Sequence, residues 1–423
     1  MSRPFIRLAL ALGLACAVTA AATSAAIENP VLYWNDQALH ATRLSRNPPP
    51  VAALHLGTFH AAIFDTVNGF DQTWESWLVD EAAPADANRD AAIAAAAYLV
   101  LQNIWGNEVN PRVMKKAYDE ALADLPADAS RAAGIVWGRA VAQRVLDERA
   151  KSGLDQPYAG EISSTEIGKW RETPPAFRPP VSPSVAHVKP FVLTSPDQFR
   201  APPPLPLDSA AYADELAFTA KVGARDDAER DEYQTLSTPF WADDLGTATP
   251  AGHWCVIAQD VARRKEFSVE QTAHLFALLT LATADAGISS WESKFYYLHW
   301  RPETAIREVT PAVNAHASAE PEFIPNMASP AHPTYTSAHS TFTGASSRIL
   351  ELYNGSDDFE FTSTSDGLPG VVRSYESFSE ASIELNMSRV WGGIHTMLDV
   401  VEGRQAGLKI ADYVFAHALR PRE

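Results

Sequence analysis

The stretch that decides the fold is SRVWGGIHTMLD, residues 388–399. It places a cation at Arg389, an imidazole at His395 and a carboxylate at Asp399, and its two glycines allow a tight loop. We expect a helix that begins at about His395, so that His395 and Asp399 lie on one helical face. The Asp399 carboxylate would then accept one ring proton of His395 and leave the other nitrogen a free lone pair. Such an imidazole suits either a bond to a metal or the chemistry of a phosphohistidine.

A second cluster lies upstream in KFYYLHWRP, residues 294–302. Its two cations, Lys294 and Arg301, are seven residues apart, which is two helical turns, so both should point to one side of a helix. Pro302 would end or bend that helix just past Arg301. The aromatic residues around the pair could exclude water, and a drier site strengthens attraction between a cation and an anion.

The third cluster is HPTYTSAHST, residues 332–341. Ser337 opens a run with helical character and is a candidate N-cap. The backbone N–H groups of Ala338 and His339 would then point out of the helix, where helix N-termini bind anions. Beside them, His339 offers a side chain that can carry a proton.

The residues singled out so far in the three clusters are three cations, the histidines His339 and His395, hydroxyl groups and one carboxylate, all within about a hundred residues. The chain as a whole is acidic, with a formal net charge of −18, so a generally basic protein does not explain them. That inventory suits a tetrahedral or trigonal oxyanion such as phosphate or vanadate. The acidic balance argues against nucleic acid and anionic membranes as partners.

These clusters resemble the signature of the vanadium-dependent haloperoxidases and the related type 2 phosphatidic acid phosphatase and bacterial acid phosphatase superfamily. The signature reads K-x6-R-P, then P-S-G-H, then S-R-x5-H-x3-D. The first and third parts match at every fixed position, whereas Thr336 and Ala338 replace the proline and glycine of the second. Residues 188–209 and 240–254 also look like segments of bacterial haloperoxidase-type members.

The resemblance implies a role for each member of the clusters. His395 would bond to vanadium, and Asp399 would orient it. The oxygens of vanadate, or of phosphate as a competing ligand, would be bound by Lys294, Arg301, Ser337, the Ala338 amide and Arg389. His339 would act as an acid and base toward incoming hydrogen peroxide, and Lys294 would polarise the bound peroxide.

The resemblance further implies the oxidation of halide by hydrogen peroxide to a hypohalous acid equivalent, with a small organic acceptor. His332 lies near the proposed halide side, where chloroperoxidases have phenylalanine and bromoperoxidases histidine, so bromide or iodide should be preferred over chloride. The motifs leave two alternatives open. One is an exported phosphatase that works through a phosphohistidine at His395, and the other is a non-catalytic oxyanion-binding protein.

The fold class should be all-α, because helical periodicity recurs along the chain and alternation of period two is weak. By resemblance, two four-helix bundles pack together, with the oxyanion site in the C-terminal one. Helices are expected within the N-terminal half, residues 27–171. A proline-rich connector, residues 172–207, precedes a C-terminal helical half, residues 208–423, with helices that include 226–235, 252–265 and 268–298.

Residues 1–26 are typical of a secretory signal, with Arg3 and Arg7, an apolar run and a small-residue cleavage site. We therefore expect export to the periplasm or the medium, with no membrane span in the mature chain. Only Cys255 would remain after cleavage, so no internal disulfide can form. A homodimer is expected from the family resemblance alone.

Overall fold

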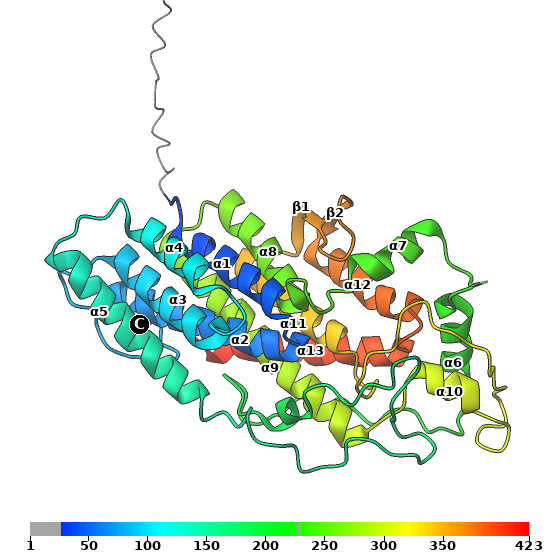
Figure 1. The fold of residues 1–423 in the computed structure, drawn as a ribbon. Coiled ribbons are helices and arrows are strands. Elements are labelled where there is room, and N and C mark those ends of the chain that lie inside the picture. The colour runs from blue at the N-terminus through cyan, green and yellow to red at the C-terminus, as the bar shows by residue number, and fades with distance from the viewer. Residues whose placement is uncertain (1–26, 227, 423) are drawn as a thin grey trace, which may run out of the picture.

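The structure, a computed structural model, describes residues 27–226 and 228–422 (Figure 1). The candidate signal, residues 1–26, lies outside the described residues. Helices dominate the described part of the chain, which confirms the all-α fold class. In the described residues no helix has both the length and the apolar character to cross a membrane.

The N-terminal half is built from five helices: α1 (Pro30–Ser45), α2 (Pro49–Asp71), α3 (Arg89–Trp105), α4 (Pro111–Leu122) and α5 (Ala129–Arg149). Four of them begin after an Asn or Asp whose side chain accepts a hydrogen bond from the first turn, namely Asn29, Asn88, Asn110 and Asp128. All five lie within residues 27–171, where helices were expected.

The C-terminal half contains the remaining helices of the described residues: α6 (Ala210–Gly223), α7 (Glu232–Phe240), α8 (Thr249–Arg264), α9 (Val269–Tyr297), α10 (Pro302–Glu308), α11 (Ala338–Asn354), α12 (Phe378–Trp391) and α13 (Met397–His417). The prediction of a helix over residues 226–235 placed the first residue of this helix too early. The helix begins at Glu232, because Asp231 caps it and forms a capping box with Gln234.

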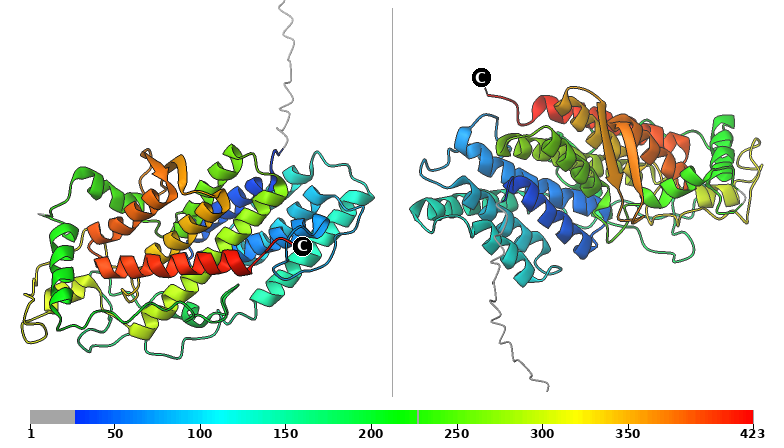
Figure 2. Two further views of the ribbon diagram at one scale, coloured as in Figure 1. Left: turned by 180° about the vertical axis from the view of Figure 1, so that it is seen from behind. Right: turned by 90° about the horizontal axis from the view of Figure 1, so that it is seen from above.

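A small antiparallel hairpin, β1 (Asp358–Thr364) and β2 (Val372–Ser377), is the one sheet in the described residues. The alternation that we judged weak is present in β1, where Phe359, Phe361 and Ser363 are buried and their neighbours are exposed. Seen from above, the hairpin lies against the helices of the C-terminal half (Figure 2). It therefore adds a layer to a helical protein without changing the fold class.

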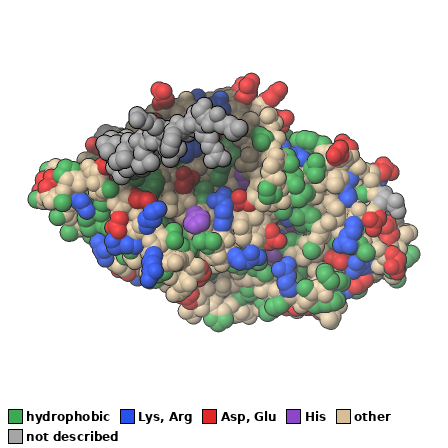
Figure 3. All heavy atoms as spheres, turned by 45° about the horizontal axis from the view of Figure 1, so that its top comes forward, with side chains coloured by type: hydrophobic (Ala, Val, Ile, Leu, Met, Phe, Trp, Pro, Cys, Tyr) green, Lys and Arg blue, Asp and Glu red, His purple; other side chains and the backbone are tan. Residues whose placement is uncertain are grey.

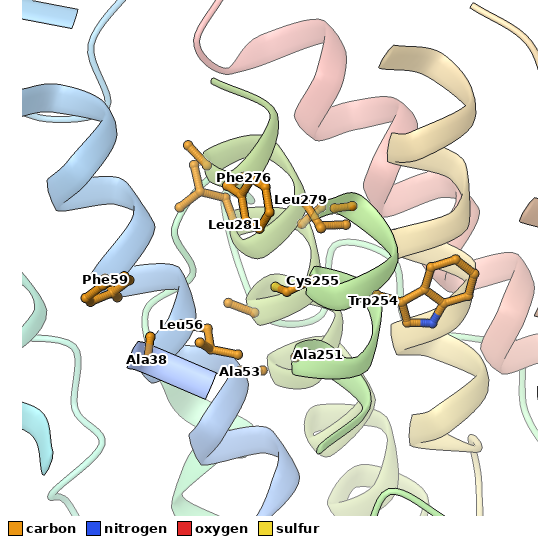
Figure 4. Close-up of a cluster of buried hydrophobic side chains, with 14 of the residues drawn as sticks. Ala38, Ala53, Leu56, Phe59, Ala251, Trp254, Cys255, Phe276, Leu279 and Leu281 are labelled. Carbon is orange, nitrogen blue, oxygen red and sulfur yellow. The ribbon is translucent and has the colours of Figure 1, made fainter. Parts of the chain in front are cut away.

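Helix α9 forms the centre of the molecule and packs against α2 on one side and α11 on another. Almost all of its side chains are buried, so its apolar character extends around the whole helix. Figure 4 shows the core where α2, α8 and α9 meet, with Leu56, Cys255 and Leu279 side by side. Burial raises the pKa of the Cys255 thiol, and Cys255 is a packing residue here.

Residues 150–209 contain only the short 3-10 helix η1 (Pro183–His187) and run along the lower edge in Figure 1. The buried Asp285 carboxylate of α9 holds this segment by accepting hydrogen bonds from the backbone N–H groups of Phe191, Val192 and Leu193. In the same way Asp65 of α2 accepts from three successive backbone N–H groups, those of residues 77–79. The connector is thus fixed to the helix that leads to Lys294.

On the face shown in Figure 3, acidic and basic side chains are interspersed with apolar ones.

Candidate active site

The centre of the site is His395, whose Nδ1 lies 3.0 Å from Oδ2 of Asp399. The same carboxylate oxygen accepts hydrogen bonds from the Thr334 hydroxyl at 2.6 Å and from the Thr396 backbone N–H at 3.0 Å. Because an ionised Asp399 only accepts, the His395 proton must be on Nδ1, and the lone pair of Nε2 accepts from Arg301 Nη1 at 3.3 Å. This arrangement is the one that a metal bond or a covalent bond to phosphorus requires.

The expectation that His395 and Asp399 share a helical face was wrong. His395 precedes the helix, Thr396 is the N-cap, and Asp399 is in the first turn of α13 as the partner of Thr396 in a capping box. The side chains still meet because the cap turns Asp399 back toward the loop. Gly393, with φ of +71°, allows the sharp bend that brings His395 to this position.

Lys294 and Arg301 also occupy different elements, contrary to the prediction of one continuous helix. Helix α9 ends at Tyr297, with Leu298 in the left-handed conformation as its C-cap. Pro302 then begins α10 at its first position instead of ending a helix, and Arg301 is the residue just before it. Both side chains nevertheless point to one side, as predicted, because each donates to a backbone carbonyl of residues 332–333.

Both cations are fully buried and tied to backbone carbonyl groups near His395. Lys294 Nζ donates to the carbonyl oxygens of Pro333 and Thr334, each at 2.8 Å, and to that of Thr336. The guanidinium of Arg301 donates to the Ile394 carbonyl at 3.0 Å and lies 3.3 Å from Nε2 of His395. These contacts hold the loops on both sides of the imidazole.

Helix α11 begins as predicted, with Ser337 as the N-cap and Ala338 as the first helical residue. The Ser337 hydroxyl accepts a hydrogen bond from the Ser340 hydroxyl at 3.0 Å. Next to it, Nε2 of His339 lies 3.0 Å from the Ala242 carbonyl oxygen. Since a carbonyl only accepts, the proton of His339 is on Nε2, and its Nδ1 can accept a proton.

Arg389 approaches from α12 and is also buried. Its Nη1 donates to the Trp241 carbonyl oxygen at 3.2 Å, whereas its Nε finds no acceptor among the described residues. A buried guanidinium with an unmatched donor is unfavourable unless an anion binds to it.

A cavity of about 140 Å³ adjoins these groups. Its reactive wall is formed by His332, Ala338, His339, Arg389 and His395. The remaining predicted site residues, Lys294, Arg301, Ser337 and Asp399, do not line the cavity but lie behind this wall and hold it.

Burial and mutual repulsion dominate the electrostatics of the site. Burial, together with Arg301, holds the pKa of Lys294 well below its usual range. Burial lowers the pKa of Arg301 to about 9 and that of Arg389 to about 10, so both remain charged at neutral pH. Burial also raises the pKa of Asp399. The site therefore gathers basic side chains around Asp399, with Asp243 and Asp244 close to Arg389, and an oxyanion would relieve the repulsion among these basic groups.

The histidines of the cavity are neutral for the same reason. Burial is the main cause that holds the pKa values of His332, His339 and His395 well below the ordinary value, and Arg301 or Arg389 adds repulsion. His332 is fixed by Arg301, whose Nη2 donates to its Nδ1 at 2.9 Å. Its Nε2 therefore carries a proton.

Two features of the site escaped the sequence analysis. One is Thr334, which joins His395 to Asp399 and could have been noticed only as a hydroxyl inside the third cluster. The other is the segment 240–244, whose carbonyl groups hold Arg389 and His339 and whose Asp243 lines the cavity. His253 lies with its Nδ1 3.0 Å from the Asp243 carboxylate.

Residues 274–423 match the family model described as the VCPO second helical-bundle domain. The chain is similar in sequence to the vanadium haloperoxidases. It is 25% identical to the vanadium chloroperoxidase of Curvularia inaequalis over 89% of this chain and 80% of that protein. The relationship that the three clusters suggested is thereby confirmed.

Solved structures of bacterial vanadium haloperoxidases share the fold. The structure described as the first bacterial vanadium-dependent iodoperoxidase superimposes with a TM-score of 0.80 at 24% identity, covering 95% of this chain and 99% of that one. A holo-type bacterial vanadium-dependent chloroperoxidase gives a TM-score of 0.69 at 17% identity, with 92% and 93% covered. The likeness extends well beyond the family-model match into the N-terminal half.

Proposed function

We propose that this chain is a vanadate-dependent haloperoxidase that oxidises halide with hydrogen peroxide to a hypohalous acid equivalent. The observation that carries the proposal is the unprotonated Nε2 of His395, whose ring is fixed at Nδ1 by Asp399 and Thr334 among buried basic side chains. The relationship to vanadium chloroperoxidase supports it. The donors of the site fit the cofactor, because the positive charge of the site and the unmatched Nε of Arg389 both favour an oxyanion.

In this proposal His395 bonds to vanadium, and Arg389, Arg301, Lys294, Ser337 and the Ala338 amide supply charge and hydrogen bonds to the oxygens. Bound vanadate supplies Lewis-acid activation of peroxide without a change of its own oxidation state. Lys294 and Arg301 contribute chiefly by charge and by holding the loops, because their donors already meet protein acceptors.

His339 is the proton carrier of the proposal. Its Nδ1 is free while Nε2 is held by the Ala242 carbonyl. Burial and Arg389 keep its pKa well below the ordinary value, so the ring is neutral at pH 7 and can accept a proton from hydrogen peroxide. Activity should then be lost as pH falls toward that pKa, because a protonated ring cannot act as the base.

We further propose that bromide or iodide is preferred over chloride. His332 lies on the cavity wall with a protonated Nε2, fixed by Arg301 on one side and by the Trp291 ring, 5.0 Å between centroids, on the other. A neutral N–H donor suits a large, weakly hydrated halide. Relative rates of chloride, bromide and iodide oxidation in wild type and His332→Phe test this idea, and an unchanged preference would remove it.

One paired assay tests the main proposal. The purified mature protein is given orthovanadate, bromide and hydrogen peroxide, and separately p-nitrophenyl phosphate without vanadate. We expect halide oxidation that depends on vanadate. Hydrolysis without halide oxidation would favour a phosphatase that uses His395 as nucleophile, and tight phosphate binding without either activity would favour an oxyanion-binding protein.

Export and self-association are part of the proposal. The candidate signal, residues 1–26, supports export to the periplasm or the medium, and mass spectrometry of the secreted chain should give an N-terminus close to Ile27. A homodimer is tested by light scattering on the purified protein.

A further inference from the structure

The cavity has a second wall whose chemistry differs from that of the reactive wall. Apolar side chains predominate in it, namely Pro49, Val181, Leu245, Trp291, Met327 and Phe342, although Arg178, Asp243 and Asp244 also line the cavity. Three of these residues, Pro49, Val181 and Leu245, lie outside the region 274–423 that carries the oxyanion motifs. Segments upstream of residue 274 therefore help to shape the space in front of the reactive groups.

This apolar wall is fixed in place by hydrogen bonds. The Trp291 indole N–H donates to the Val181 carbonyl at 3.1 Å, and the Val181 N–H donates to the Ala331 carbonyl at 2.8 Å. Asp285 holds the same connector further along, at residues 191–193. A wall that is already ordered needs little rearrangement to bind a guest, which favours binding.

The cavity, at about 140 Å³, has room for one ring. An engineered apolar cavity of about 150 Å³ in another protein binds benzene. Trp291 and Phe342 present aromatic rings to the guest, and rings prefer edge-to-face or offset contact with other rings. At the mouth, the carboxylate of Asp244 provides an acceptor for a hydroxyl group.

We propose that this cavity binds a single-ring phenol as the organic acceptor, so that halogen is transferred within the cavity. The inference rests on the proposed haloperoxidase activity, which supplies the oxidised halogen. The bound ring would lie between the apolar wall and the histidines of the reactive wall.

The transfer balances as an electrophilic substitution. A ring carbon gives an electron pair to the halogen of hypohalous acid, the carbon–halogen bond forms and the halogen–oxygen bond breaks. The ring then loses its proton, which joins the departing hydroxide as water. Overall, the phenol, halide, peroxide and one proton give the halophenol and two waters; the ring is oxidised by two electrons and the peroxide is reduced.

Val181→Trp is a suitable variant because Val181 makes its hydrogen bonds through its backbone, and the larger side chain would fill the cavity. Val136→Trp is the matched control, since Val136 is 68% exposed on α5. Phenol is titrated calorimetrically into the full mature protein without peroxide. We expect Val181→Trp to raise the Kd about tenfold or more, and Val136→Trp to leave it unchanged.

Cyclohexanol serves as the non-aromatic probe and should bind more weakly than phenol. Failure of phenol to bind to wild type, equal binding by Val181→Trp, or equal binding of cyclohexanol would each overturn the proposal. These titrations involve no turnover, so they give the same answer whether or not the haloperoxidase proposal holds.

A product analysis completes the test. With bromide and peroxide, wild type should give an ortho-to-para ratio of bromophenols that differs from the ratio given by free hypobromous acid. Any bromophenol that Val181→Trp still forms should show the ratio given by free hypobromous acid. A wild-type ratio equal to that of the free reagent would contradict transfer inside the cavity, and absence of bromide oxidation would instead contradict the proposed function.

Discussion

The His395 ring nitrogen Nδ1 lies 3.0 Å from the Asp399 carboxylate, although His395 is outside the helix that carries Asp399. One carboxylate oxygen, Oδ2, accepts from the His395 ring, the Thr334 hydroxyl and the Thr396 backbone N–H. The start of α13 and the orientation of the imidazole therefore depend on the same oxygen atom. The contributions of Asp399 and Thr334 to the orientation of His395 can therefore be tested by separate substitutions.

Asp399→Asn should weaken vanadate binding about 10- to 100-fold, the usual effect of losing a carboxylate that orients a ligating histidine. The amide oxygen can still cap α13, so the protein should fold. Equilibrium dialysis with quantification of vanadium measures the affinity. Asp260→Asn, on the exposed side of α8, is the matched control and should leave it unchanged. Equal affinity in Asp399→Asn and wild type would refute the orienting role.

Thr334 gives a second test of the same arrangement, because its hydroxyl donates to Asp399 at 2.6 Å and lies 3.1 Å from His395 Nδ1. Thr334→Val keeps the shape but removes the donor, so vanadate affinity and kcat should both fall, by about tenfold. Thr334→Ser retains the hydroxyl and should recover most of the loss. A serine variant as weak as the valine variant would show that the methyl group, and not the hydrogen bond, matters.

The parts of the site that could be predicted from the sequence are those governed by local chemistry. Ser337 was predicted as an N-cap because capping depends on the residues of a single turn, and the structure places it there. The capping pattern of Thr396 and Asp399 was equally local and readable, and it would have shown that His395 precedes the helix.

Other features depend on contacts between distant segments, which no local pattern records. Leu298 ends α9 in a left-handed conformation that no glycine announces, so Lys294 and Arg301 looked like members of one helix. The Ala242 carbonyl that fixes the His339 tautomer is 97 residues away in the chain. The sequence likewise did not show which site residues line the cavity and which lie behind its wall. Only the tertiary structure shows this.

Gly393 should be indispensable to the loop that presents His395. Its φ is +71°, and a Cβ there would come within 2.3 Å of the Gly223 carbonyl oxygen. Gly393→Ala should therefore destabilise the fold by about 2 kcal/mol or more and greatly reduce activity, since strain and a backbone clash add together. Gly370→Ala is the control, because its φ is +87° but no atom lies within 4 Å of an added Cβ. Urea unfolding of both variants separates the clash from the strain, and equal losses would contradict the role of the clash.

Buried neutral histidines should make the fold sensitive to acid. Burial lowers the pKa of His60 to about 3 and those of His55, His274 and His299 to about 4, all from 6.5. Below pH 6.5 the unfolded chain binds more protons at these groups than the folded protein does. The free energy of unfolding therefore decreases as the pH decreases. Asp65 and Asp285, whose pKa values burial raises to about 6, act in the opposite direction between pH 6 and the ordinary carboxyl pKa of 3.8. The histidines outnumber them, and the net effect should be destabilisation.

His274→Gln tests the contribution of one such group. His274 stacks on Trp74 at 4.4 Å and its Nε2 lies 2.9 Å from the Leu419 carbonyl, a bond that a glutamine amide can also make. At pH 7.5 the variant should be less stable than wild type because it loses the stacking. At pH 5.0 the gap should narrow by about 2 kcal/mol, since glutamine takes up no proton on unfolding whereas the histidine does. Urea unfolding of both proteins at the two pH values measures the gap, and a constant difference would show that His274 is not held neutral by burial.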